Sequence, residues 1–204
     1  ELNRPIKIYK LPWASLEADL QLNSIDLVIA GMTDTEERRA SIDFTDEYYR
    51  SELVLVTSKT VADTYSTVVS ESDFASFISG QVVVSQTETV TDEMIDLFAT
   101  TYGAIHASPV SSFALAATDV SNGSAFAMTA EFPVAQSIVK SFSNLGIVHI
   151  DQNILGESQA DLGVSIGIKK GNVELQDALN ASLAKISSER RTELMVAAVN
   201  RSGE

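Results

Sequence analysis

The chain has 204 residues, a formal net charge of −14 and no cysteine. This length suits one large domain or two small ones, each able to bury a core. The acidic balance argues against nucleic acid as a partner, because binding phosphates requires clustered lysine and arginine. The lack of cysteine excludes disulfides, thiolate metal sites and a cysteine nucleophile.

Apolar β-branched runs alternate with stretches of helical period along the chain. In chain order, the patterns predict a strand at 6–9, a helix at 15–21, strands at 25–30 and 53–57, a loop at 58–66, a helix at 73–79, a strand at 81–85, helices at 92–100 and 111–118, a strand at 124–128, a helix at 131–142, strands at 147–150 and 163–168, and helices at 175–186 and 192–199. This alternation predicts an α/β fold with largely parallel strands.

The run 26–49 joins an apolar strand, a glycine turn, a short charged helix and a second strand. It delivers one cation, Arg38, beside the hydroxyl of Thr33 and the backbone groups of Ala30 and Gly31. A guanidinium has a planar fork that matches both oxygens of a carboxylate, and glycine permits close approach of a ligand. The pattern therefore indicates a site for a small carboxylate.

The same run closely resembles the signature of the type II extracellular solute-binding proteins, the receptors of amino-acid ABC importers. The matching parts are Gly-Met-Thr at 31–33, Thr-x-x-Arg at 35–38 and Asp-Phe-Thr-Asp-x-Tyr-Tyr at 43–49. Residues 80–84 and 163–171 also resemble segments of that family.

The resemblance implies a periplasmic-binding-protein-like type II fold, with two α/β lobes joined by two crossover strands and a ligand in the cleft between them. Lobe 1 would comprise 1–50 and 164–204, and lobe 2 would comprise 51–163. The family's opening strand-helix unit of lobe 1 is expected to be absent before Glu1.

In lobe 1 the resemblance assigns the ligand carboxylate to Arg38 and a wall of the site to Trp13. A lone tryptophan is more often a core residue, and an arginine in Glu-Glu-Arg-Arg is usually solvated, as we expect for Arg39. Thr33 would offer its hydroxyl, or would instead cap the helix through its spacing to Glu36.

In lobe 2 the resemblance places a ligand loop at 86–91, where Glu88 replaces the family's glycine. Gln86, Thr89, Val90 and Thr91 would offer side-chain groups and amides at a helix start. The alternative for Thr91 is plain N-capping.

At the end of the strand 124–128 the family carries an aspartate that binds the ligand's ammonium group, whereas this chain has Ala130. An unpaired buried ammonium group is costly, so either Glu131 or Glu88 compensates, or the ligand lacks a standard amino group.

Other motifs point away from chemistry on the ligand. Ser165 lies in a Gly-x-Ser-x-Gly pattern, but the apolar alternation continues through it, which indicates a strand rather than a nucleophile elbow. His106 and His149 are distant in sequence and are expected to be structural. We therefore expect no catalytic residue, metal or cofactor.

The sequence thus predicts the binding receptor of an amino-acid ABC importer, extracellular or periplasmic, secreted or lipid-anchored in its full-length form. We expect a monomer that binds a polar or cationic amino acid and meets a membrane permease. The alternatives are a sensor or permease-fused receptor domain, or a dehydratase-like enzyme on the same fold that would use Glu88 and Glu131.

Overall fold

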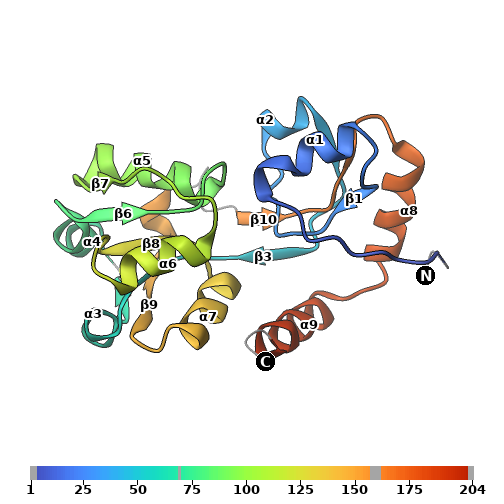
Figure 1. Cartoon of the computed structure of the whole chain (residues 1–204). Coiled ribbons are helices and arrows are strands. Elements are labelled where there is room, and N and C mark those ends of the chain that lie inside the picture. The colour runs from blue at the N-terminus through green and yellow to red at the C-terminus, as the bar shows by residue number, and fades with distance from the viewer. Residues whose placement is uncertain (1–3, 69, 157–161, 202–204) are drawn as a thin grey trace. The chain divides into compact units, whose positions relative to one another are not determined.

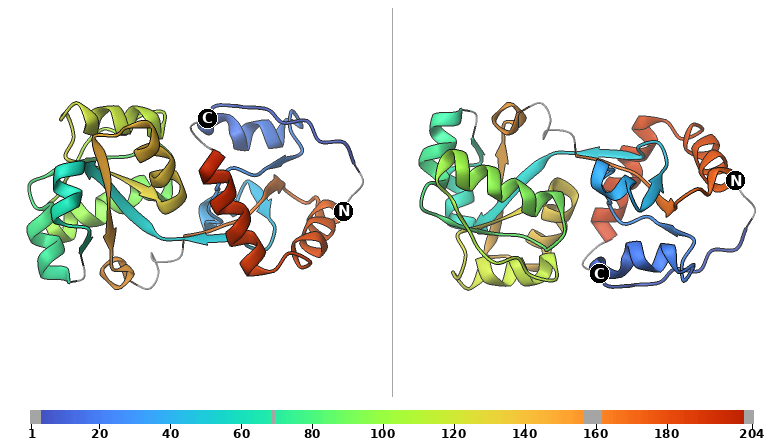
Figure 2. Two further views of the ribbon diagram at one scale, coloured as in Figure 1. Left: turned by 90° about the horizontal axis from the view of Figure 1, so that it is seen from below. Right: turned by 90° about the horizontal axis from the view of Figure 1, so that it is seen from above.

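The computed structural model describes residues 4–68, 70–156 and 162–201, and of Leu162 the backbone alone. The chain forms two compact units, residues 1–50 with 163–194 (unit 1) and residues 51–162 with 195–204 (unit 2) (Figures 1 and 2). The chain leaves unit 1 in β3 (Tyr49–Ser51) and returns in β10 (Leu162–Val164), and these two strands pair with each other. Within the described residues, no helix has the length and apolar character needed to cross a membrane.

Unit 1 is built on a three-stranded sheet in the order β1-β11-β2, with both pairs antiparallel. Its elements are η1 (Trp13–Ser15), α1 (Leu16–Gln21), β1 (Leu27–Val28), α2 (Glu36–Arg39), β2 (Ile42–Phe44), β11 (Gly167–Lys169), α8 (Val173–Leu183) and the start of α9 (Ser188–Arg201). One core cluster packs α1 against β1 and β2, through Leu20, Val28 and Ile42. A second packs α8 against β11 through Leu179 and Ile168. The sheet is therefore covered on both faces.

Unit 2 is built on a six-stranded sheet in the order β5-β9-β4-β8-β6-β7. Its elements are β4 (Leu53–Ser58), α3 (Lys59–Thr64), β5 (Thr67–Val68), α4 (Glu71–Ile78), β6 (Val82–Val84), α5 (Val90–Tyr102), β7 (Ile105–His106), α6 (Phe113–Ser121), β8 (Ala127–Glu131), α7 (Phe132–Ser141), β9 (Leu145–Ile150) and η2 (Gln152–Leu155). Strand β4 pairs antiparallel with β8 and β9, whereas β6 runs parallel to β8. The α/β class is confirmed, with a mixed sheet.

The two faces of the unit 2 sheet have separate cores. Leu53 and Leu55 of β4 pack with residues of α4 and α5, such as Phe74 and Phe98. Val54 and Val56 pack with residues of α6 and α7. Because successive side chains of a strand point to opposite faces, this division fixes the direction of every side chain along β4 and its neighbours.

Several element predictions were wrong. Residues 6–9 form no strand, and Ile6 and Ile8 are 87% and 90% exposed, because the described part of the chain pairs no strand with them. The predicted loop 58–66 contains α3, whose N-cap Ser58 accepts a hydrogen bond from the amide of Val61. The predicted strand 163–168 is two strands, because the amide of Ser165 leaves the ladder to donate to Met32.

The prediction of largely parallel strands was also wrong for unit 1, where both pairings are antiparallel. Strand-helix alternation implies parallel pairing only when each helix crosses between neighbouring strands. Here β11 comes from the far end of the sequence and inserts between β1 and β2, which the local pattern could not predict.

Gly146 of β9 provides a test of this packing. A Cβ atom added there would lie 2.6 Å from the Cβ of Ala62 in α3. We expect Gly146→Ala to lower the free energy of unfolding by about 1–3 kcal/mol through overpacking. Gly167→Ala in β11, where the nearest atom is 3.4 Å away, is the matched control and should change stability by under about 1 kcal/mol. Equal effects of the two substitutions in urea unfolding would contradict the close packing of α3 against β9 at Gly146.

Candidate functional site

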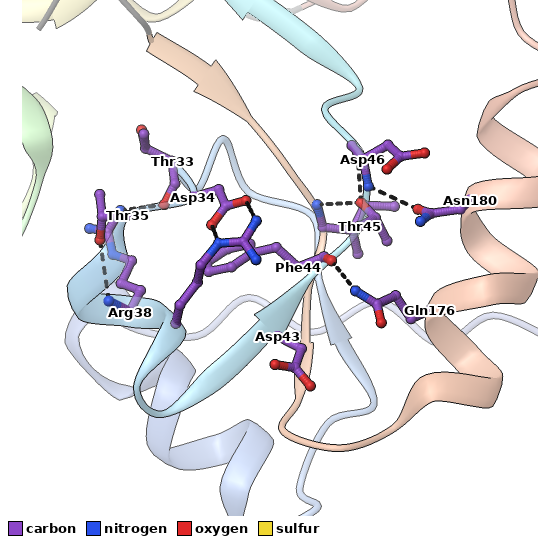
Figure 3. Close-up of polar contacts among 12 residues, drawn as sticks. Thr33, Asp34, Thr35, Arg38, Asp43, Phe44, Thr45, Asp46, Gln176 and Asn180 are labelled. Atoms are coloured by element: carbon purple, nitrogen blue, oxygen red, sulfur yellow. Dashed lines mark hydrogen bonds and ion pairs between the residues drawn. The ribbon is translucent and has the colours of Figure 1, made fainter. Parts of the chain in front are cut away.

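Arg38 is positioned by the short helix α2. Thr35 is the N-cap of this helix, and its hydroxyl oxygen accepts a hydrogen bond from the amide of Arg38 at 3.3 Å. The Nη1 atom of Arg38 donates to the carbonyl oxygen of Thr33 at 2.9 Å, and Figure 3 draws these three residues together. The Arg38 side chain is 11% exposed. The guanidinium is thus largely buried and held by protein groups rather than by solvent.

Trp13 lies against the same guanidinium. The Cζ atom of Arg38 is 5.6 Å from the centroid of the Trp13 ring, within the range of a cation–π contact. Trp13 also packs against the core cluster of unit 1, which is the core role considered from sequence. The structure therefore brings Trp13, Thr33 and Arg38 together.

Glu17 was not predicted as part of this group. Its Oε1 atom lies 3.8 Å from Nε of Arg38, and its Oε2 atom accepts a hydrogen bond from Ser41 Oγ at 2.7 Å. The signal in the sequence is that Glu17 comes four residues after Trp13, because residues four apart in a helix lie on the same side of it.

The turn before α2 depends on Gly31. Its φ of +71° is in the left-handed region, which glycine adopts without steric cost. Its amide donates to the hydroxyl of Tyr48 at 3.1 Å, and the neighbouring Ala30 is exposed. Helix capping by Thr33, the alternative from sequence, is wrong, since Thr35 is the cap.

The Asp-Phe-Thr-Asp segment after α2 is anchored to the C-terminal part of unit 1. The amide of Asp46 donates to Asn180 at 2.9 Å, and Gln176 donates to the carbonyl oxygen of Phe44 at 2.6 Å (Figure 3). The amide of Gly171 and the ammonium of Lys170 bind Asp43 and hold its pKa below the ordinary 3.8. These bonds fix β2, which follows the helix that carries Arg38.

In unit 2 the candidate residues surround the start of α5. Thr89 is the N-cap, and its Oγ1 atom accepts from the amide of Asp92 at 3.2 Å. Capping by Thr91 is therefore wrong. The Thr91 hydroxyl is fully buried and lies 3.0 Å from Ser85 Oγ and 2.9 Å from Thr89 Oγ1. The amides of Val90 and Thr91 lie in the first turn, where a helix leaves N–H groups without intrahelical acceptors.

Gln86 and Glu88 precede this cap in the sequence. Gln86 is buried, and its Oε1 atom accepts from the amide of Phe113 at 3.1 Å, which ties the loop to α6. Glu88 has a φ of +60°, in the region that favours glycine. The glycine expected there from the family pattern thus has a physical reason, and Glu88 occupies its position under strain.

The end of β8 separates Ala130 from Glu131. Ala130 is fully buried in the core on the α6 and α7 face. Thr129 and Glu131 point to the opposite face, because side chains alternate along the strand. Thr129 Oγ1 donates to the carbonyl oxygen of Thr91 at 2.8 Å, so this face is the one that meets the start of α5. Glu131, and not Ala130, therefore leaves the strand on the side of the candidate residues.

The two histidines lie apart from each other and make carboxylate contacts. His106 lies 2.9 Å from Asp92 and 2.8 Å from Asp96, both on α5, and His149 lies 2.9 Å from Glu52. Across the described residues, no group of three or more His, Asp or Glu side chains could hold a metal ion. Ser165 follows β10 and is not followed by a helix, so the sharp strand-turn-helix of a nucleophile elbow is not formed at it.

Comparison with known proteins decides the family. The profile of the bacterial extracellular solute-binding proteins, family 3, matches residues 1–197. The chain belongs to this family.

Known relatives of this solute-binding protein share its fold. The amino acid ABC transporter substrate-binding protein AbpA from Streptococcus pneumoniae, solved with L-arginine bound, is 22% identical, with a TM-score of 0.79 over 97% of this chain and 78% of that one. A second substrate-binding protein of an amino acid ABC transporter is 25% identical, with a TM-score of 0.72 over 93% and 77%. The arginine-binding extracellular protein ArtP of Bacillus subtilis is 37% identical over 54 residues, 26% of this chain and only 21% of that relative.

Glu88 allows a test of the strained loop. A non-glycine residue in the left-handed region costs about 1–2 kcal/mol. Glycine removes this cost, but its greater conformational freedom in the unfolded chain cancels part of the gain. We expect Glu88→Gly to raise the free energy of unfolding by up to about 1 kcal/mol and Glu88→Val to lower it by at least about 1 kcal/mol. Glu88→Gln is the control for charge. A loss of stability in the glycine variant, measured in urea, would contradict the strain.

His106 provides a pH test. Burial lowers the pKa of His106, but the hydrogen bonds to Asp92 and Asp96 outweigh it, and the net pKa lies above the ordinary 6.5. A raised folded pKa stabilises the fold below the unfolded pKa, and this contribution is lost as pH rises through the folded pKa. We expect His106→Gln to destabilise the protein more at about pH 5.5 than at about pH 8.5, by about 1 kcal/mol or less because the site is partly exposed. If the destabilisation caused by His106→Gln grew with pH, the expected direction would be wrong. Asp96→Asn should weaken the pH dependence.

Proposed function

We propose that this protein is the substrate-binding receptor of an amino-acid ABC importer and that its ligand is a cationic amino acid, with arginine the first candidate. The observation that carries the proposal is the fixed guanidinium of Arg38, held by the Thr33 carbonyl beside the Trp13 ring. In this arrangement Arg38 binds the ligand's carboxylate, and Trp13 covers its aliphatic part.

Three further points support the ligand class. The AbpA structure is described as bound to L-arginine, and the B. subtilis relative is named as arginine-binding. Two acids absent from the family pattern, Glu88 and Glu131, lie at the start of α5 and the end of β8. Carboxylates at these two positions of unit 2 favour a ligand that carries positive charge.

The Glu131 carboxylate binds the ligand's ammonium group, which is the role that the family gives to an aspartate. The register of β8 supports this, since Glu131 shares a face with Thr129, whose hydroxyl binds the first turn of α5. The amides of Val90 and Thr91, in the first turn of α5, add donors for anionic ligand groups.

The partner in transport is the membrane permease of the importer, and the receptor acts outside the cytoplasm as a monomer. Ligand binding shifts the receptor to its delivery-competent conformation, because only differential affinity can move such an equilibrium. Nothing is transformed chemically in this cycle.

Calorimetric titration of the full-length chain with a panel of amino acids tests the proposal. We expect arginine to bind with micromolar or lower Kd and Arg38→Ala to weaken binding at least about 100-fold, because it removes a charged, nearly buried partner of the carboxylate. Arg39→Ala is the matched control, since the adjacent Arg39 is 57% exposed and pairs with Asp34. The Kd of the Arg39→Ala variant for arginine should stay within about threefold of the wild-type value.

No binding by any amino acid, or equal losses in the two arginine variants, would overturn the assignment of Arg38. Binding of a neutral or acidic amino acid in preference to arginine would keep the receptor and reject the cationic ligand.

A further inference from the structure

Glu17 has an arrangement that the proposed function does not use. One oxygen of its carboxylate faces Nε of Arg38 at 3.8 Å, and the other accepts a hydrogen bond from Ser41 Oγ at 2.7 Å. All three residues belong to unit 1, Glu17 on α1 and Arg38 on α2. A fixed negative charge therefore lies next to the group that we assign to the ligand's carboxylate.

We propose that Glu17 is a specificity-determining residue, whose carboxylate competes with the ligand's carboxylate for Arg38 and so selects for ligands that carry compensating positive charge. This inference rests on the proposed function. Glu17 and Arg38 together carry no net charge, so a ligand with one carboxylate meets a neutral pair instead of a free cation.

Arg38 is held by contacts other than the one with Glu17. The guanidinium is also held by the Thr33 carbonyl oxygen at 2.9 Å and by the face of Trp13. The contact with Glu17, at 3.8 Å between the charged atoms, is longer than a hydrogen bond. Removing the charge of Glu17 therefore changes the electrostatics of the site while its geometry stays in place.

The Glu17 side chain itself is fixed by Ser41. Glu17 is 38% exposed, which on its own would allow a long side chain to turn into solvent. The hydrogen bond from Ser41 opposes this and keeps the carboxylate against Arg38, whose side chain is 11% exposed. Charges so near a largely buried group are screened less by salt than exposed charges.

An ordinary role for Glu17 is that of an acid in the first turn of a helix, where it stabilises the helix dipole. Asp19 lies in the same first turn and accepts a hydrogen bond from Ser15. Asp19→Asn therefore removes the same charge from the same helix and is the matched control for Glu17→Gln.

The experiment is calorimetric titration of the full-length wild type, Glu17→Gln, Ser41→Ala and Asp19→Asn with arginine and its neutral isostere citrulline, and with glutamate and its neutral isostere glutamine. Weak ligands are measured by displacement of bound arginine. We expect Glu17→Gln to bind citrulline and glutamine about fivefold to tenfold more tightly than the wild type does. The gain in affinity should be larger for glutamate and smallest for arginine. Ser41→Ala should shift the same way by less, and Asp19→Asn should stay within about twofold.

Weaker binding of every ligand by Glu17→Gln would show that Glu17 positions Arg38 and would overturn the inference. So would shifts equal to those of Asp19→Asn, or no gain for either neutral ligands or glutamate. The Arg38→Ala titration reports separately on the proposed function, because that variant loses binding whichever way Glu17 acts.

Discussion

The candidate site depends on the orientation of one guanidinium. Arg38 is nearly buried, and its bond to the Thr33 carbonyl closes the turn between β1 and α2. The residues around this bond help to fix it: Gly31, in the left-handed region, turns the chain, Thr35 caps the helix, and the guanidinium lies over the ring of Trp13. A buried cation that is held before any ligand arrives loses little freedom on binding, which is the physical basis of preorganised recognition.

A comparison of Arg38 with Arg39 shows that only one position of α2 can hold the guanidinium in this orientation. Arg38 and Arg39 have the same chemistry and follow each other in a helix of four residues. The hydrogen bond to Asp34 raises the pKa of Arg39, and the Arg39 side chain is 57% exposed. Successive helical positions differ in direction by about 100°, so only one of the two can face Trp13. An exchange of these roles would need a shift of the cap from Thr35.

The sequence predicted the local parts of this site better than the long-range ones. The α/β class follows from the alternation of strand and helix patterns along the chain, and the turn and short helix that carry Arg38 follow from strong local signals, whereas the role of Trp13 was implied by the family resemblance. The wrong predictions share a different cause. The strand at 6–9 needed a partner strand, and the single strand at 163–168 was broken by an amide that donates to Met32, more than 130 positions away. Local pattern carries no information on such partners.

Register explains the remaining discrepancy, which concerns the acid expected at Ala130. A change of one residue along a strand moves a side chain to the other face of the sheet. An aspartate at Ala130 would point into the core of α6 and α7, where a carboxylate without a partner is costly. The adjacent Glu131 points to the face of Thr129 and α5. Of these two neighbouring positions, only that of Glu131 lets a carboxylate avoid the apolar core, and the chain has its acid there.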